Sequence, residues 1–163
     1  MKIFTFALLY AVPVLILTGC AGKNAEPEKT PQIQLAGFTS ADEKIAHDVA
    51  KVFAAAFEKS LISGDFKHLE SQLPPLPSVK KFTAAEFAGM RDSMIKLYGT
   101  PRKLSYAASL QQGKLRDMLW KVTFEWKRTP EVPAETREIL LCVRIFKANG
   151  KSPEIAGFFF KRF

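Results

Sequence analysis

The spacing of apolar residues changes near Arg102, from a repeat of three or four residues to an alternation of every second residue. Before Arg102, apolar side chains recur at the spacing that places them on one side of an α-helix. After it, they alternate with polar side chains, as in a strand with one buried face. Because the helical segments all come first, the sequence predicts an α+β fold in which two or three helices pack on one face of a four-stranded antiparallel sheet.

Three helices are expected before the change of period. The first begins at a capping-box pattern in residues 40–43 and ends at Gly64. The second is short and has Asp65 as its N-cap, and the third begins at Thr83 and ends before Gly99. The apolar sides expected to face the sheet are Ile45, Val49, Val52, Phe53 and Phe57 in the first helix and Met90, Met94 and Leu97 in the third.

Four strands are expected after the change of period. Residues 103–110 and 120–127 alternate, residues 139–146 are apolar on both faces, and Asn149-Gly150 predicts a tight turn into residues 155–162. The inward side chains of the first two strands are expected to be Leu104, Tyr106, Ala108, Leu110, Trp120, Val122, Phe124 and Trp126. The outward side chains are expected to be Lys103, Ser105, Ser109, Lys121, Thr123, Lys127 and Arg144.

The first twenty residues resemble the signal of a bacterial lipoprotein. Lys2 precedes an apolar run that is shorter than the roughly 20 residues of a spanning helix, and the run ends in Leu17-Thr18-Gly19-Cys20. The resemblance implies cleavage before Cys20 and acylation of its thiol, so that lipid on Cys20 anchors the chain to a membrane. Ala21 implies the outer membrane, facing the periplasm, in a bacterium with two membranes. The alternative is an ordinary secretory signal with a cysteine among its last small residues.

The chain is therefore expected to have three parts. Residues 1–19 form the signal peptide, residues 20–37 form a polar, flexible tether, and residues 38–163 form a single domain long enough to bury its own core. With Cys20 assigned to lipid, only Cys142 remains, so no intramolecular disulfide is expected. Cys142 lies in an apolar strand, where a buried structural role is expected.

Positive charge is concentrated in the second half of the domain. Residues 96–163 carry 14 basic and six acidic side chains, a balance of +8, whereas residues 38–95 carry seven and eight, a balance of −1. A basic surface would attract anionic partners such as phospholipid head groups or acidic envelope glycans, and the alternative is a solvated surface that keeps the protein soluble. Nucleic acid is not an expected partner, because the basic residues are scattered and an exported protein rarely meets it.

The order of elements, together with Ser63-Gly64-Asp65-Phe66 and Tyr98-Gly99-Thr100-Pro101, is similar to the cone-shaped domain of the nuclear transport factor 2-like and cystatin-like family. Small bacterial lipoproteins of unknown function look like this too. The resemblance covers residues 38–163 and implies that the helices and a curved sheet enclose a cavity. It also implies that the exposed sheet face often forms dimers.

Some relatives of this kind are isomerases or dehydratases with acidic residues or histidines inside the cone. Here the inward strand side shows Tyr106, Trp120, Phe124 and Trp126 without an acid or a histidine. The catalytic candidates are His47, Asp48 and His68 on the helices, and a structural role is favoured for each, because neighbouring helix residues point about 100° apart. Neither metal-ligand spacing nor a phosphate-binding loop occurs, so no metal and no cofactor are expected.

These observations favour a lipid-anchored envelope protein that binds a partner rather than catalyses a reaction. The aromatic strand side predicts either a filled core or a pocket for a small apolar ligand. The outer sheet face predicts contact with a second copy or with another envelope protein. The alternative is an enzyme of the cone type, an isomerase, dehydratase or hydrolase, that acts on a small apolar substrate.

Overall fold

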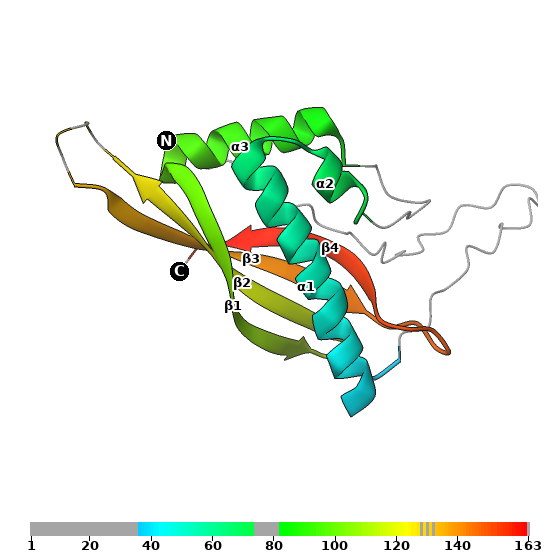
Figure 1. Ribbon diagram of the computed structural model, residues 1–163. Coiled ribbons are helices and arrows are strands. Elements are labelled where there is room, and N and C mark those ends of the chain that lie inside the picture. Colours follow the sequence, from blue (N-terminus) through cyan, green and yellow to red (C-terminus); the bar gives the residue numbers. More distant parts are fainter. Residues whose placement is uncertain (1–35, 74–81, 128, 130, 132, 163) are drawn as a thin grey trace, which may run out of the picture.

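The computed structural model describes residues 36–73, 82–127, 129, 131 and 133–162. The helices are α1 (Ser40–Ser63), α2 (Lys67–Glu70) and α3 (Ala84–Tyr98), and the strands are β1 (Thr100–Gln112), β2 (Leu115–Trp126), β3 (Glu135–Phe146) and β4 (Glu154–Lys161). The strands pair antiparallel in the order β1-β2-β3-β4. The predicted α+β arrangement of helices followed by a four-stranded antiparallel sheet is thereby confirmed (Figure 1).

The predicted signal peptide, the lipid-acceptor Cys20 and nearly all of the tether lie outside the described residues. None of the helices in the described ranges is long and apolar enough to span a membrane.

The first helix begins one residue earlier than the sequence pattern suggested. Thr39 is the N-cap of α1: its backbone N–H donates to Asp42 Oδ2 at 2.8 Å, and the Asp42 backbone N–H donates to Thr39 Oγ1 at 3.3 Å. The helix ends as predicted at Gly64, which has φ +81°. The predicted N-cap role of Asp65 is wrong, because Phe66 occupies the N-cap of α2 and Asp65 instead accepts a hydrogen bond from the Lys67 backbone.

The side of α1 that packs on the sheet differs from the predicted one. Phe53 and Phe57 are fully buried as expected, but Ile45 is 41% exposed and Val52 is 55% exposed. The buried side is completed by small residues and one leucine: Ala46, Ala50, Ala54 and Leu61. The sequence-based expectation placed the bulky β-branched residues toward the sheet. In the structure the alanines face the sheet and let the helix approach it closely, so a second apolar side of α1 faces outward.

A bulge in β1 reverses which residues face the core. Tyr106 pairs with Trp120, but Ala108 pairs with Leu119, so the extra residue Ala107 shifts the register. Because side chains alternate along a strand, one extra residue moves every later side chain to the other face. Ala108 and Leu110 therefore lie on the outer face and Ser109 on the core face opposite Met118, contrary to prediction.

The core lies between α1 and the sheet. Helix α1 packs across all four strands and α3 packs on β1 and β2, as Figure 1 shows. Phe57 is the centre of an aromatic cluster, with ring centroids 5.7 Å from both Phe158 and Phe160 and 6.4 Å from Phe87. Phe158 and Phe160 lie on the core face of β4, beside the core residues Val143 and Leu141 of β3, while Phe159 lies on the other face. The triple-Phe segment is therefore apolar on both sides.

Helix α3 begins as predicted and ends against the sheet. Its capping box joins Thr83 and Glu86, which confirms the sequence assignment. The predicted burial of Leu97 is wrong, since this side chain is 51% exposed. The Leu97 carbonyl instead accepts a hydrogen bond from Arg137 Nη1 at 2.9 Å, a favourable position for a cation at a helix C-terminus.

Candidate functional site

The face of the sheet turned away from the helices, here called the outer sheet face, is arranged in rows across the strands. The central row is entirely apolar and crosses all four strands: Ala108, Leu119, Cys142 and Phe159. The row on one side consists of Ser105, Lys121, Leu140 and Lys161, and the row on the other consists of Leu110, Asp117, Arg144 and Gly157. An apolar centre between polar rows is the composition of a protein–protein interface.

One ion pair is built into this face. Arg144 donates from Nε to Asp117 Oδ1 at 2.7 Å and from Nη2 to Asp117 Oδ2 at 2.9 Å, a bidentate contact. Asp117 is fully buried, and the guanidinium lies 5.0 Å from the Phe159 ring centroid. The hydrogen bonds to Asp117 raise the pKa of Arg144, so the guanidinium stays charged, and the bidentate contact joins the side chains of β2 and β3.

The sequence pattern predicted Arg144 on the outer sheet face, whereas Asp117 was not among the expected site residues. The cross-strand pairing of Asp117 with Arg144 follows only from the register of β2 and β3, which depends on the length of the loop between them. The sequence did offer one signal: Asp117 lies two positions before Leu119, so both side chains point to the same face of β2.

Cys142 is a buried structural residue, as predicted. Its side chain is fully buried in the central apolar row, and burial raises the pKa of the thiol to about 11. A thiol with this pKa remains protonated at neutral pH, so it lacks the thiolate needed for nucleophilic attack.

Much of the positive charge of the sheet is paired within the chain. Ion pairs join Lys121 to Glu138 at 3.1 Å and Lys127 to Glu125 at 3.6 Å. Further pairs join Arg102 to Glu125, Arg116 to Glu43, Arg137 to Glu135 and Lys147 to Asp42. The basic half of the sequence is therefore locally neutralised over much of the sheet.

The catalytic candidates lie on the surface of the helices. His47 Nδ1 is 3.8 Å from Asp48 Oδ1, and Asp48 also pairs with Lys44 at 3.6 Å. The His47 ring lies edge-on to Tyr106, with centroids 4.9 Å apart. His68 lies on α2, where it lines a hollow beside α1. These contacts of His47 are with a neighbouring exposed carboxylate and an aromatic ring. The structural role favoured for His47, Asp48 and His68 stays a prediction.

The four residues of the predicted ligand pocket lie in three settings. Trp120 and Phe124 are part of the core cluster, and Tyr106 lies half-exposed beside α1, with its ring 5.5 Å from that of Trp120. Trp126 lines a separate hollow of about 260 Å³ at the C-terminal end of α3. Of the four, Trp126 alone lines either of the two hollows described here, and a shared pocket stays a prediction.

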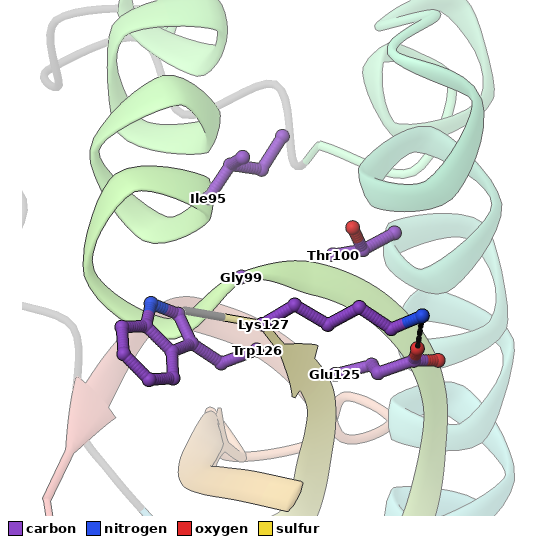
Figure 2. Close-up of a pocket in the computed structure, with 6 residues that line it drawn as sticks. All are labelled: Ile95, Gly99, Thr100, Glu125, Trp126 and Lys127. Atoms are coloured by element: carbon purple, nitrogen blue, oxygen red, sulfur yellow. Dashed lines mark ion pairs between the residues drawn. The ribbon is translucent and has the colours of Figure 1, made fainter. Parts of the chain in front are cut away.

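Figure 2 shows this hollow at the junction of α3, β1 and β2. Lys127 extends across it to Glu125, and the Trp126 indole lies at its edge beside Gly99. The Arg137 guanidinium stacks on the Trp126 ring at 3.7 Å. Contacts with Arg102, and then with Lys127, lower the pKa of Glu125, so this carboxylate is ionised at neutral pH. Within the described part of the chain, no group of three or more potential ligands is placed to hold a metal ion.

No protein-family model matches this chain, and a search of curated proteins finds no match. Among solved structures, a ketosteroid isomerase-like protein from Erwinia carotovora atroseptica is similar, with 11% identity and a TM-score of 0.46, over 75% of this chain and 96% of that one. A five-fold substituted variant named Rd1NTF2_05 has 14% identity and a TM-score of 0.42, over 71% of this chain and 98% of that one. At these identities the likeness concerns the fold alone, and no activity follows from it.

Proposed function

We propose that this chain is a lipid-anchored protein of the bacterial cell envelope whose folded domain acts by binding. The partner we assign to the outer sheet face is a second copy of the chain. The observation that carries this assignment is the apolar row on the face opposite the helices, in which Ala108 and Phe159 are partly exposed while Leu119 and Cys142 between them are buried. The proposed location is the periplasmic side of the outer membrane.

The charges beside the apolar row favour a second copy as the occupant. Asp117 pairs with Arg144 within the flanking rows, and Lys121 pairs with Glu138 beside them, whereas Lys161 has no ion-pair partner in the described part of the chain. A face neutralised to this extent can approach its own copy with less repulsion than the overall charge of +8 would give. Leu110, which is 43% exposed, adds apolar area next to the row. Dimers with two-fold symmetry use the same patch on both subunits, which suits a face that is its own complement.

The dimer is tested by photo-crosslinking the full chain in cells. A photoreactive phenylalanine analogue at position 110 is expected to give an adduct at twice the mass of the chain. The matched control is the same analogue at Leu97, an exposed leucine on α3, which is expected to give none. If the analogue at position 110 forms an adduct with another envelope protein instead, that protein and not a second copy is the partner. Equal yields of adduct from positions 110 and 97 would contradict the assignment of this face.

The anchor is tested separately by metabolic labelling. The wild-type chain is expected to incorporate a fatty-acid probe, and Cys20→Ala is expected to abolish labelling, because the thiol at position 20 is the acceptor in the proposal. Cys142→Ala is the control and should keep full labelling. Full labelling of Cys20→Ala would refute the lipid anchor and leave the sheet-face proposal standing.

A further inference from the structure

A groove lies between α1 and α2, away from the outer sheet face. It includes a hollow of about 420 Å³ whose lining contains Val52, Ala55, Ala56, Lys59, Lys67 and His68. The two helices are joined at this point by a hydrogen bond from the Leu69 backbone N–H to the Ser60 hydroxyl at 3.0 Å. Figure 1 shows α2 lying beside the second half of α1.

The apolar floor of this groove continues along α1 as a straight stripe. Ile45, Val49, Val52 and Ala56 follow one another at intervals of four, three and four residues, which places them on one side of the helix. At 1.5 Å per residue the stripe is about 16 Å long. Val52 has 55% of its surface exposed and Ile45 has 41%, whereas Val49 and Ala56 are partly buried and Val49 packs against the core, so the stripe is open mainly at Ile45 and Val52.

The positive charges at the groove are unpaired, in contrast to those of the sheet. Neither Lys59 nor Lys67 forms an ion pair with another residue in the described part of the chain. The α1 carboxylates are already engaged, because Asp48 pairs with Lys44 and Glu58 accepts a hydrogen bond from the Leu104 backbone at 2.6 Å. The groove therefore combines exposed apolar surface with two ammonium groups that have no ion-pair partner among the described residues.

We propose that the groove between α1 and α2 binds an acidic amphipathic helix of a partner protein. Apolar side chains of that helix, at intervals of three and four, would pack on the stripe, while its carboxylates would lie opposite Lys59 and Lys67. The groove is too open to enclose a small apolar ligand, since pockets for such ligands bury most of the ligand surface. This surface is separate from the outer sheet face and goes beyond the function proposed above.

The test uses the full chain and two stapled helical peptides. Both peptides carry leucines at intervals of four, three and four, and their flanking positions are all glutamate in one and all lysine in the other. Fluorescence anisotropy is expected to show binding of the glutamate peptide that weakens as salt is raised. Lys59→Glu combined with Lys67→Glu should weaken it by about 10-fold and should bind the lysine peptide better than the wild type does.

The matched control is Lys51→Glu, which reverses an exposed lysine about 100° around α1 from Val52 that forms no ion pair within the described residues. It is expected to change the affinity by less than about 2-fold, as is typical of a surface charge outside the stripe. Val52→Asp should also remove binding, and circular dichroism of each variant verifies that the helices remain folded.

Several outcomes would overturn the proposal. Equal binding of the two peptides by the wild type, or equal weakening by Lys51→Glu and by the double reversal, would show that the charges at the groove do not select the ligand. No binding of the glutamate peptide would remove the proposed occupant. A further outcome is that the glutamate peptide fails to bind while vesicles containing phosphatidylglycerol, or a second copy of the chain, bind in a way that depends on Lys59 and Lys67. In that case the acidic helix is wrong as the occupant of the groove, and the ligand that binds is the occupant.

Discussion

Gly99, between α3 and β1, is a position where a single added methyl group should be highly disruptive. Its φ of +98° and ψ of −156° lie in a region that residues with a side chain rarely adopt. A Cβ at this position would lie 2.3 Å from the carbonyl oxygen of Glu125 and 2.7 Å from Trp126 Cα, both in the backbone of β2. The obstacle is therefore main chain, which cannot rotate away as a flexible side chain can.

Two contributions set the expected size of the effect of Gly99→Ala. The backbone strain costs about 1–3 kcal/mol. Forcing β2 aside resembles overpacking of a close-packed interior, which costs typically about 1–3 kcal/mol. We therefore expect Gly99→Ala to lower the free energy of unfolding by about 2–6 kcal/mol, a large part of the stability of an ordinary domain.

Gly89 offers a matched control in the helix that Gly99 terminates. A Cβ at Gly89 meets nothing within 4 Å, and alanine is favoured over glycine in a helix interior by about 0.5–1 kcal/mol. Gly89→Ala should therefore raise the free energy of unfolding while Gly99→Ala lowers it. Urea unfolding followed by circular dichroism measures both, and a Gly99→Ala protein within about 0.5 kcal/mol of the wild type would refute the reasoning, since that difference is typical of neutral surface substitutions.

Three further changes have defined outcomes. Phe57→Ala empties the centre of the aromatic cluster and should cost about 3–5 kcal/mol in urea unfolding, whereas a loss below about 1 kcal/mol would mean that the cluster collapses into the space. Arg144→Met leaves Asp117 buried without its partner and should lower the free energy of unfolding by about 3–5 kcal/mol. Adding Asp117→Asn should recover part of that loss, and a further loss of stability in the double variant would contradict the pairing. The hydrogen bond from Lys147 lowers the pKa of Asp42 from 3.8 to about 2, so the stability that this contact contributes is present above pH 3.8 and is lost as the pH falls toward 2. Unfolding midpoints measured from pH 5 to 2 should therefore decline less steeply in Lys147→Met than in the wild type. An unchanged slope would show that Asp42 is not responsible for the decline.

The sequence was sufficient to predict the order of the elements because start and stop signals coincided with the change of period. Thr83 with Glu86, Gly64 and Asn149-Gly150 all have local conformations that their own side chains, or the lack of one, dictate. Such signals depend on a few neighbouring residues, so they do not change with the contacts that the rest of the chain makes.

The faces of the elements were harder to predict, because they depend on contacts that are distant in the sequence. The bulge at Ala107 has no local signature, yet it moves Leu110 from the core face to the outer face. In α1, two apolar sides compete for the sheet, and the close approach allowed by Ala46 and Ala50 decides in favour of the side with fewer bulky residues. The stripe with Val52, which gives rise to the groove proposal, is therefore visible only once the packing is known.

The way the chain enters the domain has a mechanical consequence. The backbone N–H of Ala36 donates to the Lys147 carbonyl at 2.9 Å, and the Lys147 side chain binds Asp42 in the first turn of α1 at 2.7 Å. Glu43 in the same turn pairs with Arg116 at the start of β2. Tension applied to the chain ahead of Ala36 would therefore be distributed over α1, β2 and the end of β3 at once, so that a domain held at this end resists being unravelled from its first helix.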